Sequence, residues 1–73
     1  MINPYENLAN AIILQAVADY RKALKQLKQN PDYPEALGTK REVERFFHSQ
    51  WFQCLTKVDG PALLKTLQKE VAA

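Results

Sequence analysis

The stretch QNPDYP, residues 29–34, decides the fold because it separates two long amphipathic segments. Proline disfavours the α conformation in the residue before it and clashes with the preceding turn, so a helix that reaches this stretch must end there. Pro34 is tolerated in the first turn of a new helix, and Asp32 and Glu35 have the spacing of a capping box. The stretch therefore predicts a connection between two helices.

The segment before this connection predicts one amphipathic helix over residues 4–29. Its start has an N-cap residue, Asn3, followed by a proline and by Glu6 at the third helical position. Apolar residues then recur at three- and four-residue steps and form a broad stripe, as expected for a helix that faces a core. The stripe contains Tyr5, Leu8, Ile12, Ala16, Tyr20, Leu24 and Leu27, flanked by Ile13 and Val17, and it omits Leu14.

The segment after the connection predicts a second helix over residues 33–56. Its apolar face contains Ala36, Leu37, Val43, Phe47, Trp51, Cys54 and Leu55. Gly38 costs about 1 kcal/mol relative to alanine inside a helix, and Thr39 with Glu42 is another capping-box pattern, so a break at this glycine is the alternative. We expect a continuous helix, because a break would leave a first piece of only about five residues.

A short third helix is predicted over residues 60–71. Asp59 is its N-cap, and Pro61 lies in its first turn. Its apolar positions are Leu63, Leu64, Leu67 and Val71. No stretch alternates apolar and polar residues as a strand does. The sequence therefore predicts an all-α fold in a single domain, 1–73: an antiparallel hairpin of two long helices, closed by the short third helix.

Composition narrows the class of protein. The 73 residues are 47% hydrophobic and 25% charged, which is typical of a globular domain. The single cysteine, Cys54, excludes an internal disulfide and fits a reducing compartment. The longest apolar run, residues 11–14, is far shorter than the ~20 residues of a membrane-spanning helix. A net charge of +2 does not by itself indicate a polyanionic partner. We expect a cytoplasmic protein without a membrane partner.

Two strings of the sequence, AIILQAVADYRKA (residues 11–23) and ERFFHSQWFQCLTKVDG (residues 44–60), resemble a group of known proteins. These are short uncharacterised proteins encoded by phages and by integrative and conjugative elements of Gram-positive bacteria. In them an AII..A..DYR.A helix precedes an ERFF.S.WF helix and an LT..D turn. The resemblance implies an accessory role in a mobile element, in a bacterial cytoplasm. It implies no activity and no set of functional residues.

The residues needed for catalysis are scarce. His48 and Cys54 are the only histidine and the only cysteine. On the predicted helix they lie about 240° apart, so they cannot form a pair of nucleophile and base within one chain. There is no glycine-rich phosphate-binding pattern and no metal-ligand spacing of His, Asp and Glu. We expect no catalytic, cofactor-binding or metal site, and a protein that is not an enzyme.

The segment RFFHSQWF, residues 45–52, contains four of the seven aromatic residues. On one continuous helix four rings cannot all face the same partner helix. The simplest interpretation is that the third helix and the end of the first wrap around them as the main core. The alternative is an exposed aromatic flank, because Trp, Tyr and Arg often anchor protein interfaces. Leu14, on the back of the first helix, also indicates such a surface.

The aromatic flank predicts a small non-enzymatic helical module that binds another protein or a second copy of itself. The candidate contact residues are Tyr20, Arg45, Phe46, Trp51 and Phe52.

A basic row along the first helix indicates a different function, nucleic-acid binding. The candidates are Arg21, Lys22, Lys25, Lys28, Lys40 and Arg41. The simpler interpretation is a solvated flank, in which lysine stems cover the margin of the apolar stripe. Glu42 and Glu44 interrupt the basic surface, and no helix-turn-helix pattern is present. Nucleic-acid binding is therefore the alternative to protein binding.

Overall fold

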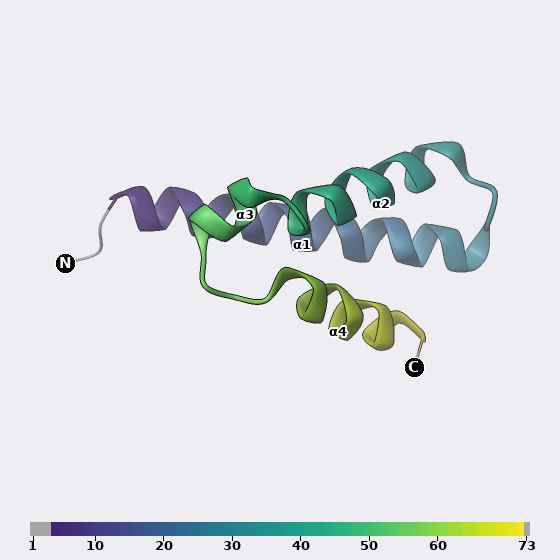
Figure 1. Cartoon of the computed structure of the whole chain (residues 1–73). Coiled ribbons are helices and arrows are strands. Elements are labelled where there is room, and N and C mark those ends of the chain that lie inside the picture. The colour runs from purple at the N-terminus through teal and green to yellow at the C-terminus, as the bar shows by residue number, and fades with distance from the viewer. Residues whose placement is uncertain (1–3, 73) are drawn as a thin grey trace.

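The computed structural model describes residues 4–72, which contain four helices and no strand (Figure 1). The helices are α1 (Pro4–Gln29), α2 (Pro34–Phe47), α3 (Gln50–Leu55) and α4 (Gly60–Ala72). The all-α fold predicted from the sequence is confirmed. The helix start predicted at Asn3 lies outside the described residues.

Helices α1 and α2 form the predicted antiparallel hairpin (Figure 1). The N-cap of α2 is Tyr33, in an extended conformation and without a side-chain capping bond. The predicted capping box of Asp32 and Glu35 is therefore wrong. Pro34 is the first residue of α2 and restricts the residue before it to extended conformations, which makes Tyr33 the cap position and leaves Asp32 one residue too early.

The predicted second helix is not continuous. It passes through Gly38 without a break but ends at Phe47, and the chain resumes as α3 at Gln50. Ser49 makes the junction: its hydroxyl donates to the carbonyl oxygen of Phe46 at 2.6 Å and accepts from the backbone N–H of Phe52 at 3.2 Å. This serine is the N-cap of α3, a position for which serine is a preferred residue.

The break at Ser49 allows the aromatic rings to share one core. On a continuous helix Phe47 and Phe52 would point about 140° apart. After the break their ring centroids are 4.9 Å apart, and both side chains are buried. Burying both rings together favours the broken helix over the continuous one, because aromatic side chains contribute much of the stability of a small core.

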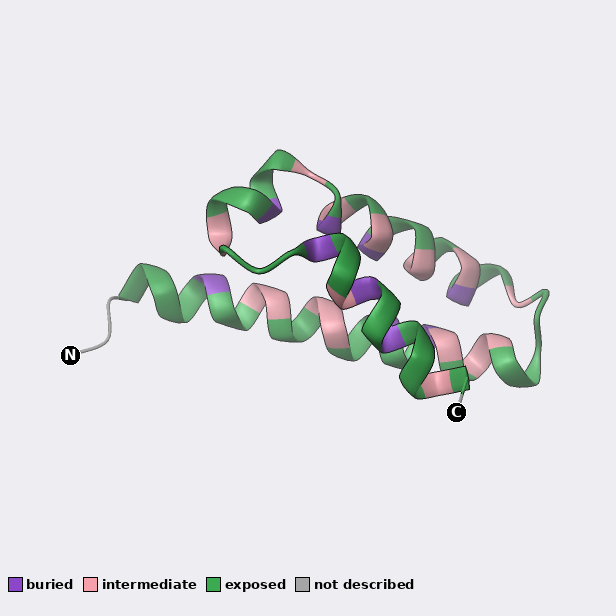
Figure 2. Ribbon diagram, turned by 60° about the horizontal axis from the view of Figure 1, so that its bottom comes forward, coloured by how far each residue is buried: buried purple, intermediate pink, exposed green. Residues whose placement is uncertain are grey.

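Helix α4 packs against both helices of the hairpin, as the sequence predicted (Figure 2). Its N-cap is confirmed, because the carboxylate of Asp59 accepts a hydrogen bond from the backbone N–H of Ala62 at 3.2 Å. The core that α4 completes contains residues from all four helices. They are Tyr20, Val43, Phe47, Phe52, Leu64 and Leu67.

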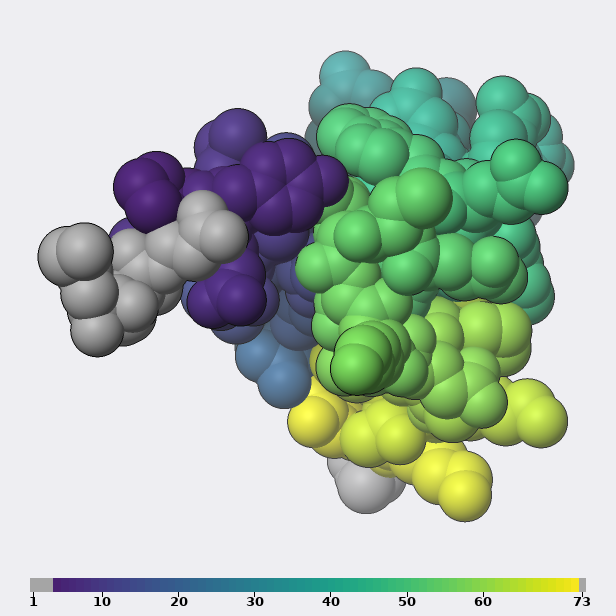
Figure 3. Space-filling view, turned by 60° about the vertical axis from the view of Figure 1, so that its left-hand side comes forward, coloured from purple at the N-terminus to yellow at the C-terminus, as the bar shows by residue number. Residues whose placement is uncertain are grey.

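The first turns of α1 project beyond the rest of the molecule (Figure 3). At 1.5 Å per residue, the 26 residues of α1 span about 39 Å and the 14 residues of α2 about 21 Å. Tyr5 and Leu8 belong to the predicted core-facing stripe, yet they are 58% and 59% exposed. Ala9 is buried, so the packing of other helices against α1 begins at this residue. The stripe faces the core only where other helices reach it.

Candidate functional site

The structure separates the five predicted contact residues. Tyr20 and Phe52 are buried in the core, with exposed fractions of 0% and 1%, so they are not surface residues. Arg45 is exposed but lines a hollow between α2 and α4, beside residues such as Pro61. Only Phe46 and Trp51 share one surface, where their ring centroids are 5.2 Å apart in an edge-to-face arrangement.

Phe46 and Trp51 line a small hollow between α1 and the start of α3. Ile12 and Ala16 of α1 and Val43 of α2 complete its apolar lining. We call these five residues the apolar pit. Trp51 is 58% exposed, so a large apolar ring in the lining of the pit is open to solvent. Trp, when it is exposed next to a hollow of this kind, is a frequent anchor of protein interfaces.

Acidic side chains continue from the pit along the seam of α1 and α2. Asp19 and Glu42 line the same hollow as the pit and also line the adjoining hollow, which extends to Glu35. We call these three carboxylates the acidic rim, and the pit and rim together the α1–α2 groove. Lys22 is the one basic residue among the groove's lining residues.

The carboxylates of the acidic rim are not neutralised by ion pairs. Asp19 accepts a hydrogen bond from the amide of Gln15 at 3.0 Å, and Glu35 accepts one from the hydroxyl of Tyr33 at 3.1 Å. Within residues 4–72 the two ion pairs join other carboxylates to Arg21 and to Lys40. The rim therefore presents negative charge beside an apolar surface.

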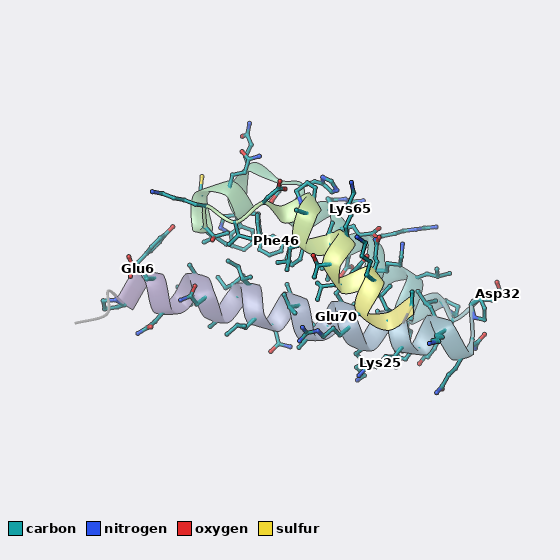
Figure 4. The ribbon with its side chains drawn as sticks, turned by 90° about the horizontal axis from the view of Figure 1, so that it is seen from below. Glu6, Lys25, Asp32, Phe46, Lys65 and Glu70 are labelled. Carbon is teal, nitrogen blue, oxygen red and sulfur yellow. The ribbon has the colours of Figure 1, made fainter. Side chains whose placement is uncertain are left out.

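Arg21, Lys25 and Lys28 of the predicted basic row lie on the side of α1 that faces α4, where they line a hollow together with Glu70 and Val71. Arg21 forms an ion pair with Glu70 at 3.0 Å, and Lys28 donates to the backbone carbonyl of Val71 at 3.1 Å. Lys25 and Glu70 lie on this side of the molecule (Figure 4). Arg21 and Lys28 thus hold α4 against α1.

The remaining predicted nucleic-acid residues divide between two helices. Lys22 and Lys25 line one hollow on α1 together with Arg21. Lys40 and Arg41 lie on α2, where Lys40 pairs with Glu44 at 3.0 Å. The structure therefore does not gather all six residues into one basic surface.

The positions of the other reactive residues differ from expectation in one respect. Cys54, predicted on the buried face of a continuous helix, is exposed, because the break at Ser49 rotates α3 relative to α2.

No group of three or more His, Cys, Asp and Glu side chains could hold a metal ion anywhere in residues 4–72. Over the same residues, no helix combines the length and apolarity required to cross a membrane.

A polar cluster at the margin of the core was not predicted from the sequence. The hydroxyl of Tyr20 donates to the carboxylate of Glu44 at 2.7 Å and accepts from the amide of Gln68 at 2.9 Å. This hydroxyl therefore connects α1, α2 and α4. The position of Tyr20 in the apolar stripe indicated burial, but nothing in the sequence pairs it with Gln68.

The cluster fixes the protonation of both acidic groups. Burial raises the pKa of Tyr20 to about 12, although the hydrogen bond from Gln68 acts in the opposite direction. For Glu44, burial raises the pKa of the carboxyl, but the hydrogen bonds from Tyr20 and Lys40 outweigh this effect and hold the pKa below its usual value. At neutral pH Tyr20 is therefore a protonated donor and Glu44 an ionised acceptor.

Replacing Tyr20 with phenylalanine is expected to lower the free energy of unfolding by about 2 kcal/mol near pH 7, because a hydrogen bond to a charged acceptor is lost. A carboxyl with a lowered pKa stabilises the fold above its unfolded pKa of about 4.3, and this contribution disappears as the pH falls through the folded pKa. The difference between wild type and Tyr20→Phe should therefore be smaller near pH 3 in urea unfolding experiments. An equal difference at both pH values would contradict the assigned role of Glu44.

The comparisons found no match to this chain among protein-family models, curated proteins or solved structures.

Proposed function

We propose that this protein is a non-enzymatic helical module that binds another protein through the α1–α2 groove. The observation that carries the proposal is Trp51, a large apolar side chain more than half exposed in the lining of an apolar pit. Exposed aromatic rings of this kind are costly in water unless they are covered by a partner. Phe46, packed edge to face against Trp51, supports its position.

The resemblance to proteins of phages and integrative elements supports an accessory or regulatory role in such an element. The strings that carry the resemblance include Ile12 and Ala16 of α1, Phe46 of α2 and Trp51 of α3. These four residues belong to the apolar pit. The proposal therefore places the interaction surface within the part of the chain that resembles those proteins.

The test is affinity capture from a nuclease-treated lysate of the cells that encode the protein. Wild type and Val58→Ala should retain the same partner, whereas Trp51→Ala should lose most of it. Val58 is the matched control because it is 55% exposed, close to the 58% of Trp51, but lies outside the groove. Equal capture by all three proteins would show that the groove is not the binding surface.

Nucleic-acid binding is the second candidate, and the hollow lined by Lys22 and Lys25 favours it. The residues around this hollow include no acidic side chain. Such a surface would bind DNA with an affinity that falls steeply with salt, because each neutralised phosphate releases counterions. Repeating the capture without nuclease separates the two candidate functions. A partner that is held through DNA should then still be retained by Trp51→Ala.

A further inference from the structure

The shape of the α1–α2 groove fits one helix of a partner. The groove follows the seam from Trp51, beside α2, to Glu35 in the first turn of α2. From Glu35 to Phe46 along α2 the distance is about 16 Å at 1.5 Å per residue, or about three turns of a helix. An amphipathic helix binds such a surface by placing apolar side chains, one or two turns apart, into a hollow.

The charge of the groove indicates which charged residues of the partner helix flank its apolar side chains. Asp19 and Glu42 stand at the edge of the apolar pit, and no ion pair within the described residues neutralises either carboxylate. A partner with acidic residues at this edge would meet like charges, and a partner with Lys or Arg would meet opposite charges. We infer that the groove binds an amphipathic helix of another protein whose apolar stripe is flanked by Lys or Arg. This inference rests on the proposed function.

A second copy of the chain matches this chemistry less well than an amphipathic basic helix does. The exposed apolar end of α1 contains Leu8, but its only charged residue over positions 4–12 is Glu6, which would add a negative charge to the rim. The basic surface around Lys22 and Lys25 has the required charge, but Ala18 is the only apolar residue in its lining and cannot fill the pit. Leu14, 67% exposed, lies one helical turn before Ala18, so the described part of a second copy offers a single large apolar side chain beside this basic surface rather than a stripe of them.

The inference is tested with two synthetic peptides of about 15 residues, which form about four helical turns. Both carry leucine at alternating three- and four-residue steps. One has lysine beside the leucine stripe, and the other has glutamate at the same positions. Trp51 is the only tryptophan, so its fluorescence reports occupancy of the groove directly. We expect the lysine peptide to bind at least about tenfold more tightly than the glutamate peptide, and to weaken with added salt.

Charge-neutralising variants identify the acidic rim as the source of this preference. Asp19→Asn and Glu42→Gln should each weaken binding of the lysine peptide by about threefold, as expected for a partly exposed ion pair. Glu6→Gln removes the same charge from α1 outside the groove and should change nothing. Trp51→Ala lacks the fluorescent ring, so its binding is measured by calorimetry. It should bind neither peptide.

Three results of the peptide experiment would overturn the inference. They are equal affinity for the two peptides, a lysine preference that survives both rim variants, and no binding of either peptide. A dimer in light scattering that dissociates in Trp51→Ala would also overturn it, because the occupant would then be a second copy. Trp51-dependent capture from the lysate without peptide binding would leave the proposed function in place and reject only the basic helix as the partner.

Discussion

Replacing Phe52 with alanine is expected to remove about 3–5 kcal/mol from the free energy of unfolding, which is most of the stability of a domain of this size. The ring is 1% exposed and packs against Phe47, with ring centroids 4.9 Å apart, and against Phe46, at 5.5 Å. Its loss opens a cavity at the point where α3 meets the rest of the core. Circular dichroism during urea unfolding should show a largely unfolded variant.

The neighbouring residue provides the control for this prediction. Trp51 is larger than Phe52 but 58% exposed, and its main contact is the edge-to-face pair with Phe46. Trp51→Ala should therefore cost only about 1 kcal/mol, the value of one aromatic pair. Equal losses for the two variants, or a larger loss for Trp51→Ala, would show that α3 is rotated relative to the structure described here.

Replacing Gly60 with alanine is expected to destabilise the fold by about 3 kcal/mol, at the upper end of the range for overpacking. A β-carbon at this position would overlap the backbone carbonyl oxygen of Phe47 and would also lie 3.2 Å from the ring of Phe52. The carbonyl belongs to the end of α2 and cannot move without displacing that helix. Gly60 thus permits the close approach between the start of α4 and the end of α2.

The other glycine should respond in the opposite direction. Gly38 lies in α2, and a β-carbon there would meet no atom within 4 Å. Gly38→Ala should therefore stabilise the protein by about 1 kcal/mol, because alanine is the better helix former. Neither glycine has a positive φ, so packing alone separates the two outcomes. Thermal unfolding of both variants measures the difference, and a loss of stability in Gly38→Ala would contradict it.

The elements that were predicted correctly have strong local signals. Two prolines in residues 29–34 and the apolar period of α1 indicated the hairpin, and Asp59 indicated the start of α4. The break at Ser49 was missed because the apolar period continues across it. What decides the break is the shared burial of Phe47 and Phe52, which depends on the tertiary fold.

The surface was harder to predict than the helices. Periodicity shows which face of a helix is apolar, but not how far along the helix other elements cover it. Tyr20 is fully covered, whereas Leu8 on the same predicted stripe is exposed. The acidic rim was missed for a related reason. Asp19 and Glu42 become neighbours only when α1 and α2 pair in one register, and no local pattern relates the two residues.

The projecting end of α1 makes the stability of the molecule uneven along one helix. From Pro4 to Leu8 the backbone is held by helical hydrogen bonds with little tertiary cover, and a helical segment this short is marginal on its own in water. Around Tyr20 the same helix opens only when the core does. Amide hydrogens along α1 therefore exchange with solvent over a wide range of rates, fastest at the projecting end, so the first turns of this helix fray independently of global unfolding while the segment around Tyr20 stays rigid.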